Sequence, residues 1–88
     1  MSVSGRLPGR IRDLRIEASR LDGLAQDAHD LASELYGRSK PANAQEAQRR
    51  AIELDQTALD LRLHASELEA ALAHAGLVEA VTTLLAGA

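Results

Sequence analysis

Apolar residues recur every three or four positions along two long stretches of this 88-residue chain. In the second stretch, residues 43–75, the steps alternate between three and four without interruption. Such a 3.5-residue period keeps one seam of a helix against a partner helix over its whole length, as in coiled coils. The seam positions are Ala44, Ala47, Ala51, Leu54, Ala58, Leu61, Ala65, Leu68, Leu72 and Ala75. The pattern predicts a long helix over residues 43–75 that packs against another helix.

The first stretch has the same spacing and predicts a second long helix over residues 8–36. Pro8 suits the first turn of a helix, where its missing N–H costs nothing. The seam positions are Ile11, Leu14, Ala18, Leu21, Ala25, Ala28, Ala32 and Leu35. Gly23 lies inside this helix at a cost of about 1 kcal/mol relative to Ala, and we interpret it as a surface glycine. Residues 1–7 lack periodicity and are expected to form a flexible arm.

Residues 37–42 separate the two periodic stretches and predict a turn. Gly37 is placed to take the left-handed conformation that ends many helices, and Pro41 cannot easily continue the helix. Asn43 and Glu46 have the spacing of a capping box, so the second helix is expected to begin at Asn43. A short connection between matched seams predicts an antiparallel helical hairpin.

Gly76 follows the second seam, and the apolar residues beyond it form a separate pattern. Leu77, Val78, Val81, Leu84 and Leu85 fall on one helical face. We therefore expect a short C-terminal helix over residues 77–86, packed either on its own hairpin or on another chain. The predicted fold class is all-α, a single domain that forms a helical bundle by oligomerisation.

The charge distribution supports the hairpin pairing. The net charge is +3 over residues 1–20 and −4 over residues 21–36, then +3 over residues 37–50 and −5 over residues 51–88. Folding the hairpin lays the basic start of the first helix along the acidic end of the second, and the acidic end of the first along the basic start of the second. An antiparallel homodimer satisfies the same pattern.

The composition indicates that an isolated chain is only marginally stable. The apolar residues are mostly 17 Ala and 15 Leu, and Tyr36 is the one aromatic residue. Each buried position therefore removes little area from water, and a chain this short buries a small share of its surface. The sequence has no Cys, which excludes disulfides and Cys-based zinc sites. Oligomerisation is the remaining means of stabilisation.

The overall charge and hydropathy argue against nucleic acid and membrane partners. The net charge is −3, and the sequence lacks both a basic excess for a phosphate backbone and aromatic residues for base stacking. No apolar run approaches the length of a bilayer span, and the first nine residues lack the hydrophobic core of a signal peptide. We expect a cytoplasmic protein or, alternatively, one exported without a cleaved signal peptide.

No constellation of residues points to catalysis. His29 and His64 are expected to lie about 20 Å apart along the hairpin, too far to share a metal ion. His74 completes the set of three histidines, which we interpret as solvated or salt-bridged, with a metal bridged between subunits as the alternative. The serines lack a neighbouring base and orienting acid. We therefore predict no enzyme activity, no cofactor and no small-molecule substrate.

A second apolar set on the far side of the second helix predicts an interface. Ile52, Leu59 and Leu63 would be in water in a two-helix hairpin, and contiguous exposed aliphatic side chains usually mark an interaction site. The alternative is that they are isolated surface aliphatics. The full predicted interface comprises Leu24, Leu31, Ile52, Leu59, Leu63, Leu77, Val81 and Leu84. These residues predict a protein–protein interaction module that forms a homodimer or binds a helical partner protein.

Two other hypotheses follow from layout and charge. In size and in its two-helix layout, the sequence resembles the WXG100 (ESAT-6-like) secretion family, whose helices meet at a Trp-x-Gly bend. Here Tyr36 and Gly37 are adjacent at the bend without a Trp, and no C-terminal Tyr-based export signal follows. The resemblance implies a small secreted helical hairpin. The acidic segments 22–34 and 67–79 instead suggest a small regulator or inhibitor that binds a basic surface of a target protein.

Overall fold

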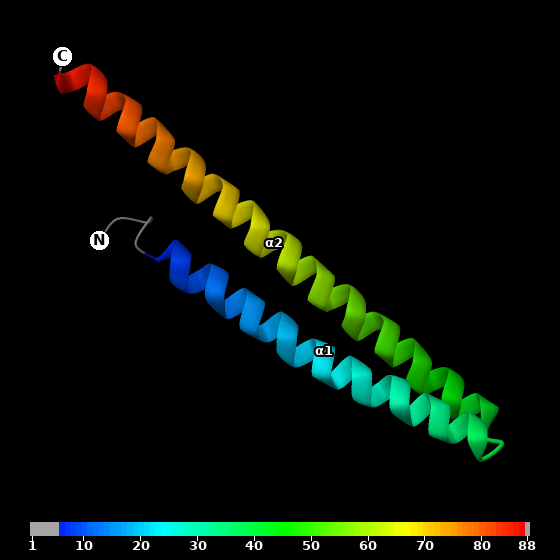
Figure 1. The fold of residues 1–88 in the computed structure, drawn as a ribbon. Helices are drawn as coiled ribbons and strands as arrows, with labels where there is room; N and C mark the ends of the chain where they lie inside the picture. Colours follow the sequence, from blue (N-terminus) through cyan, green and yellow to red (C-terminus); the bar gives the residue numbers. More distant parts are fainter. Residues whose placement is uncertain (1–5, 88) are drawn as a thin grey trace.

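Two long helices make up nearly all of the computed structural model, which describes residues 6–87. Helix α1 spans Leu7–Gly37 and helix α2 spans Pro41–Gly87. They lie side by side and run in opposite directions (Figure 1). The prediction of an all-helical chain with two long helices is confirmed. Most of the predicted N-terminal arm lies outside the described residues.

The buried residues of both helices are the seam positions predicted from the sequence. Nine of the twelve buried hydrophobic residues are Ala, whose small side chains let two helices approach closely. Leu54, Leu61, Leu68 and Leu72 are half-buried and pack beside them. The buried set is Ile11, Leu14, Ala18, Leu21, Ala25, Ala28, Ala32, Ala44, Ala47, Ala51, Ala58 and Ala65. No residue after Ala65 is buried in the described part of α2.

The turn between the helices differs from the sequence prediction. Gly37 keeps helical geometry, and Ser39 is the residue with a positive φ, of 60°. The Lys40 N–H donates to the Leu35 carbonyl at 2.9 Å and the Ser39 N–H to the Tyr36 carbonyl at 3.1 Å, which is the Schellman pattern of helix ends. The expectation that Gly37 takes the left-handed position was therefore wrong by two residues.

Helix α2 begins two residues before the predicted capping box. Pro41 is its first residue, and the Ala44 N–H donates to the Lys40 carbonyl at 3.0 Å. Proline at this position is pre-organised for a helix and lacks an N–H that would have no partner. Asn43 therefore lies inside the first turn, and the capping-box interpretation of Asn43 and Glu46 was wrong.

Helix α2 continues without a break through Gly76. A Cβ built at this glycine would meet no atom within 4 Å, and its φ is not positive. The predicted separate helix over residues 77–86 is therefore not present, and those residues extend α2. Residues 77–87, which we call the overhang, project past the start of α1 (Figure 1).

The molecule is long and thin. Its extents are 74 × 17 × 13 Å and its radius of gyration is 20.6 Å, whereas a compact chain of this length has a radius of about 12 Å. It exposes 6539 Å² of surface, against about 5000 Å² for a compact monomer of this mass. The shape therefore leaves about 1500 Å² more surface in water than a compact fold would.

Candidate interaction surface

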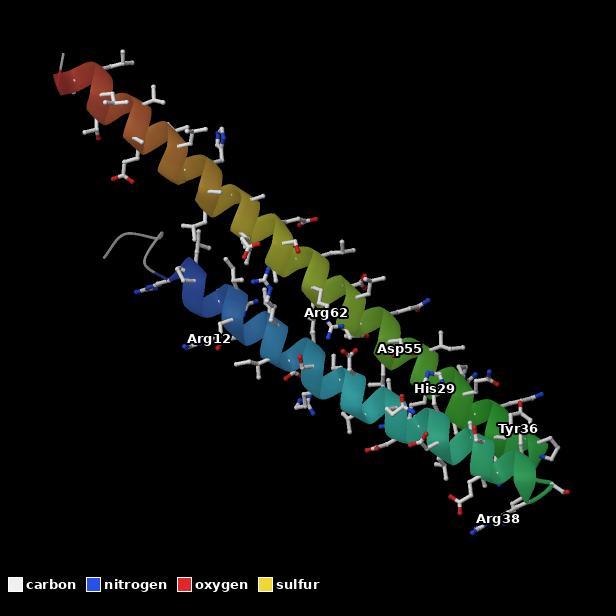
Figure 2. The ribbon with its side chains drawn as sticks, viewed as in Figure 1. Arg12, His29, Tyr36, Arg38, Asp55 and Arg62 are labelled. Carbon is white, nitrogen blue, oxygen red and sulfur yellow. The ribbon has the colours of Figure 1, made fainter. Side chains whose placement is uncertain are left out.

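One flank of the helix pair carries a ladder of four polar contacts between α1 and α2. The α1 members each follow a seam residue and recur every seven positions, and so do the α2 members. Figure 2 shows His29 and Asp55 facing each other near the middle of the ladder. The four contacts are Arg15 with Glu69, Asp22 with Arg62, His29 with Asp55, and Tyr36 with Gln48.

Three contacts of the ladder each include a hydrogen bond of ordinary length. Nη1 of Arg15 donates to Oε2 of Glu69 at 3.0 Å, and Nη1 of Arg62 donates to Oδ1 of Asp22 at 3.2 Å. Nε2 of His29 lies 2.9 Å from Oδ2 of Asp55. All these side chains remain about half exposed, so the ladder fixes the register of the helices more than it adds to their stability.

The residue numbers of the four pairs have a constant sum of 84. The net charges of whole helix halves predict the pairing of the helices but not this residue-by-residue order. The sequence does contain a signal for this order. In each heptad, the residue that directly follows the second seam residue lies beside the seam, where antiparallel helices place complementary side chains. At the bend, where the acidic end of α1 was expected to pair with the basic start of α2, Arg38 of the turn bonds to Glu34 and Arg49 bonds to Glu46 of its own helix. No ion pair between α1 and α2 is found there among the described residues.

The ladder makes thermal stability sensitive to acid. The hydrogen bond from Arg62 lowers the pKa of Asp22, and that from Arg15 lowers the pKa of Glu69. A carboxylate with a lowered pKa in the fold contributes stability above its unfolded pKa, near 4, and loses it as the pH falls through the folded value. We expect the melting temperature to fall on acidification below pH of about 4, and to fall less in Asp22→Asn with Glu69→Gln.

Circular-dichroism melts at neutral and acidic pH measure this effect. Asp13→Asn with Asp27→Asn is the matched control, since neither carboxylate forms an ion pair among residues 6–87. The control is expected to keep the acid sensitivity of the unmodified chain. Equal acid sensitivity in the ladder variant and the control would show that the ladder does not contribute.

The opposite flank of the pair carries leucines in place of a polar ladder. Leu24 and Leu31 stand two positions after Asp22 and His29, on the other side of the seam, and both are exposed. Around Leu31 the surface forms an open groove with Ala47 and Arg50 in its lining. The two flanks of the helix pair therefore differ: the flank opposite the ladder carries these two exposed leucines among polar residues such as Glu17 and Arg50.

A third surface, the outer face of α2, is apolar along much of the helix. At 100° per residue, nine small or apolar residues of α2 fall within one face about 80° wide that points largely away from α1, with Asp55 at its edge. The six large members are at least 47% exposed, and Leu84 is 75% exposed. We call this face the outer stripe: Ile52, Leu59, Leu63, Ser66, Ala70, Ala73, Leu77, Val81 and Leu84.

The C-terminal part of α2 is more apolar than the sequence analysis allowed. An 18-residue window of this helix has a mean hydropathy of 1.4 and contains no buried residue. By length and composition alone it could cross a membrane, so the expectation that no stretch reaches that length was wrong. The apolar positions are interrupted by His74, Glu79 and two Thr, which hid the stretch from a search for unbroken runs. A single such helix is weak evidence of a membrane span.

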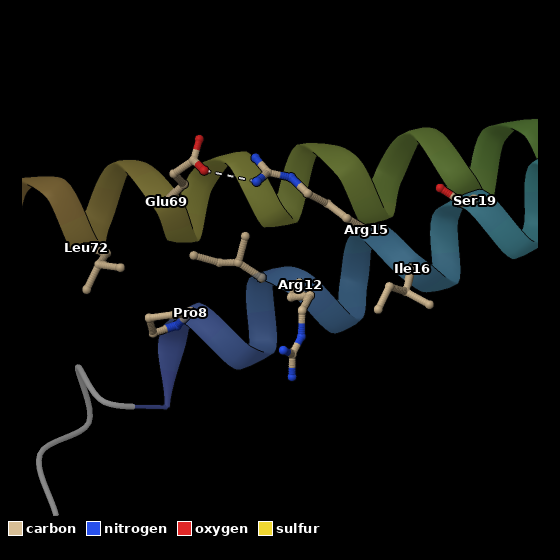
Figure 3. A pocket seen from close by; sticks show the side chains of 8 residues that line it. Pro8, Arg12, Arg15, Ile16, Ser19, Glu69 and Leu72 are labelled. Carbon is tan, nitrogen blue, oxygen red and sulfur yellow. Dashed lines mark hydrogen bonds and ion pairs between the residues drawn. The ribbon is translucent and has the colours of Figure 1, made fainter.

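An open groove of about 570 Å³ lies where the start of α1 meets α2 (Figure 3). Arg15 reaches across to Glu69 at one side of this groove, and Ile16 lies on its α1 side with 60% of its surface exposed. The full lining is Pro8, Ile11, Arg12, Arg15, Ile16, Ser19, Glu69 and Leu72. The sequence analysis missed Ile16 because it lies outside both the seam and its flanks.

The eight interface residues predicted from the sequence are all exposed, but they lie on two surfaces. Six belong to the outer stripe, which extends into the overhang, whereas Leu24 and Leu31 lie on the flank opposite the ladder. Residues 77–86 were predicted to pack as a separate helix. In the structure they continue α2, and Leu77, Val81 and Leu84 continue the outer stripe. Exposed large apolar residues outside the prediction are Ile16, Tyr36, Val78 and Leu85.

Two of the three histidines contact carboxylates. His29 contacts Asp55, and Nδ1 of His64 lies 3.9 Å from Oε2 of Glu67. Within residues 6–87 no three His, Asp or Glu side chains are close enough together to hold a metal ion.

Comparison with protein-family models, with curated proteins and with solved structures gives no match to this chain. The surfaces of the helix pair are therefore the basis for any functional assignment.

Proposed function

We propose that this protein is a non-enzymatic protein–protein interaction module whose helical hairpin associates with itself through the outer stripe of α2. The supporting observation is the exposure of six large aliphatic residues, with small residues between them, along one face of helix over about 48 Å, from Ile52 to Leu84. Isolated aliphatic residues on a protein surface need no explanation, but a contiguous exposed face usually marks an interface.

The thin shape of the chain supports the same proposal. Two helices side by side bury mostly Ala, and Ala contributes little area to a core. Packing a further helix on the outer stripe would give α2 a second buried face and complete a bundle of the four-helix type. The roughly 1500 Å² of additional exposed surface exceeds the roughly 800 Å² that each partner buries in a standard interface.

The decisive experiment is the native mass of the full chain across a concentration series, by sedimentation equilibrium or light scattering. Ile52→Asp with Leu59→Asp is expected to reduce the mass to that of one chain, 9.4 kDa, because the interface would have to bury two unpaired charges. The same variant should melt at a lower temperature at concentrations where the unmodified chain associates.

A matched control adds two charges to the outer face of α1. Ser19 and Ser33 are exposed, and Ser19→Asp with Ser33→Asp leaves the outer stripe unchanged. This control should retain the mass of the unmodified chain. A single-chain mass for the unmodified protein at all concentrations, or an unchanged mass in the stripe variant, would contradict the proposal.

The two other hypotheses from the sequence stay predictions. Export in the manner of the WXG100 family predicts protein in the culture medium. Binding to a basic target surface predicts a partner whose capture is lost steeply as salt is raised.

A further inference from the structure

Part of the outer stripe is symmetric in residue size about residue 68. Its large residues Ile52 and Leu59 stand 16 and 9 positions before residue 68, and Leu84 and Leu77 stand 16 and 9 positions after it. Between them lie small residues, Ser66 and Ala70, at two positions either side of the same midpoint. Leu63 and Val81 fall outside this symmetry, because their mirrored positions are Ala73 and Asp55. The symmetric positions of the stripe match those of a second copy turned end to end.

We infer that the outer stripe binds the outer stripe of a second copy, with the two α2 helices antiparallel and crossing near residue 68. This inference rests on the self-association proposed above and adds its orientation and register. A two-fold interface places the same patch of both copies in contact, so residue i of one chain faces residue 136 − i of the other. Leu59 then faces the partner copy's Leu77, and Ile52 faces its Leu84.

The overhang favours the antiparallel orientation. In a parallel pair the two overhangs would pack only on each other, because α1 begins level with Leu77 in the register set by the ladder. In the antiparallel pair, each overhang packs on residues 49–59 of the second copy, which α1 of that copy already supports from behind. The overhang thereby becomes part of a bundle and leaves the water.

Helix polarity agrees with this orientation. Antiparallel helices place opposite ends of their dipoles together, whereas parallel helices place like ends together.

Cysteine cross-linking tests the register, because the chain has no cysteine of its own. Two variants are made in the full chain, Leu59→Cys and Leu77→Cys, and each is first shown to keep the mass of the unmodified protein. Each alone is expected to form no disulfide dimer on mild oxidation, since antiparallel copies hold the two identical positions about 27 Å apart. An equal mixture should form a disulfide-linked dimer that contains one chain of each variant.

The control pairs Leu59→Cys with Ser33→Cys on the outer face of α1, and this mixture should give no cross-link above the background of random collision. Self-linkage of either single variant would overturn the antiparallel orientation. A dimer that forms no disulfide in the mixture would overturn the register. In both cases self-association would still hold, so the failure of this inference is distinguishable from failure of the proposed function.

A membrane is the competing occupant of the overhang, and the same protein tests it. The unmodified chain is floated with vesicles of phosphatidylcholine and phosphatidylglycerol, and a dimer with a covered stripe should stay unbound. A single-chain mass together with flotation would overturn both the antiparallel interface and the self-association on which it rests.

Discussion

Ala58→Asp is expected to remove a large part of the stability of the helix pair and to lower its melting temperature strongly. Ala58 is 0% exposed and lies in the seam between α2 and α1, packed with Ala18 and Leu21. An aspartate there would be a buried charge without a partner, which costs about 3–5 kcal/mol. The whole stability of a chain this short is about 4–13 kcal/mol. Far-UV circular dichroism and a thermal melt measure the loss of helix.

Ala42→Asp is the control with the same chemical change and the opposite expectation. Ala42 is exposed in the first turn of α2, where the structure has no acidic residue. A carboxylate near a helix N-terminus is favourable by about 0.3–1 kcal/mol. The control should therefore melt at the same temperature as the unmodified chain or slightly higher. A seam variant as stable as this control would show that the two helices do not pack along the Ala positions.

A larger apolar residue at the same site probes the close approach of the helices without adding charge. Leucine at residue 58 would force α1 and α2 apart, and overpacking of this kind costs about 1–3 kcal/mol. Ala58→Leu should thus lower the melting temperature by less than Ala58→Asp while keeping the helical spectrum. This graded response would separate a steric effect from an electrostatic one.

The seam was predictable from the sequence because its physical cause is local and repetitive. A helix that alternates steps of three and four can present one continuous apolar edge only to a partner helix. The start of α1 near Pro8 was predictable for the same kind of reason, since proline suits the first turn of a helix. These features need no knowledge of distant contacts.

The ends of the helices were harder to predict because glycine permits a break without requiring one. Gly37 and Gly76 each cost a helix about 1 kcal/mol relative to Ala, yet α1 includes Gly37 as its last residue and α2 continues past Gly76. At the turn, Pro41 restricts the residue before it to an extended conformation. The reversal of the chain therefore falls on Ser39, two residues after the glycine.

Continuity through Gly76 also decides what the interface can be. A break there would have given two short apolar faces with independent orientations, one before residue 76 and one after it. With one straight helix, Leu63 and Leu77 fall on the same face, because 14 residues are close to four full turns. The outer stripe therefore exists only because the helix is unbroken. It could not be predicted from residues 43–75 and 77–86 taken as two separate helices.

Gly76→Pro is expected to separate the overhang from the rest of α2 and to disrupt association. Proline at residue 76 removes the N–H that bonds to the carbonyl of residue 72 and clashes with that carbonyl, at a cost of about 3 kcal/mol or more. A single chain can avoid this cost by letting the overhang unfold, but the proposed dimer needs the overhang in helical form. The dissociation constant should therefore rise by about two orders of magnitude.

Gly76→Ala is the matched control, because a Cβ at this position meets no other atom and alanine favours the helix by about 1 kcal/mol. It should keep or strengthen association and slightly raise the helical signal, whereas Gly76→Pro should lower that signal by at most the contribution of residues 77–87. Sedimentation equilibrium and circular dichroism measure both effects on the full chain. If the two variants behave alike, the chain breaks at Gly76 in solution, and a stripe that spans residues 52–84 cannot exist.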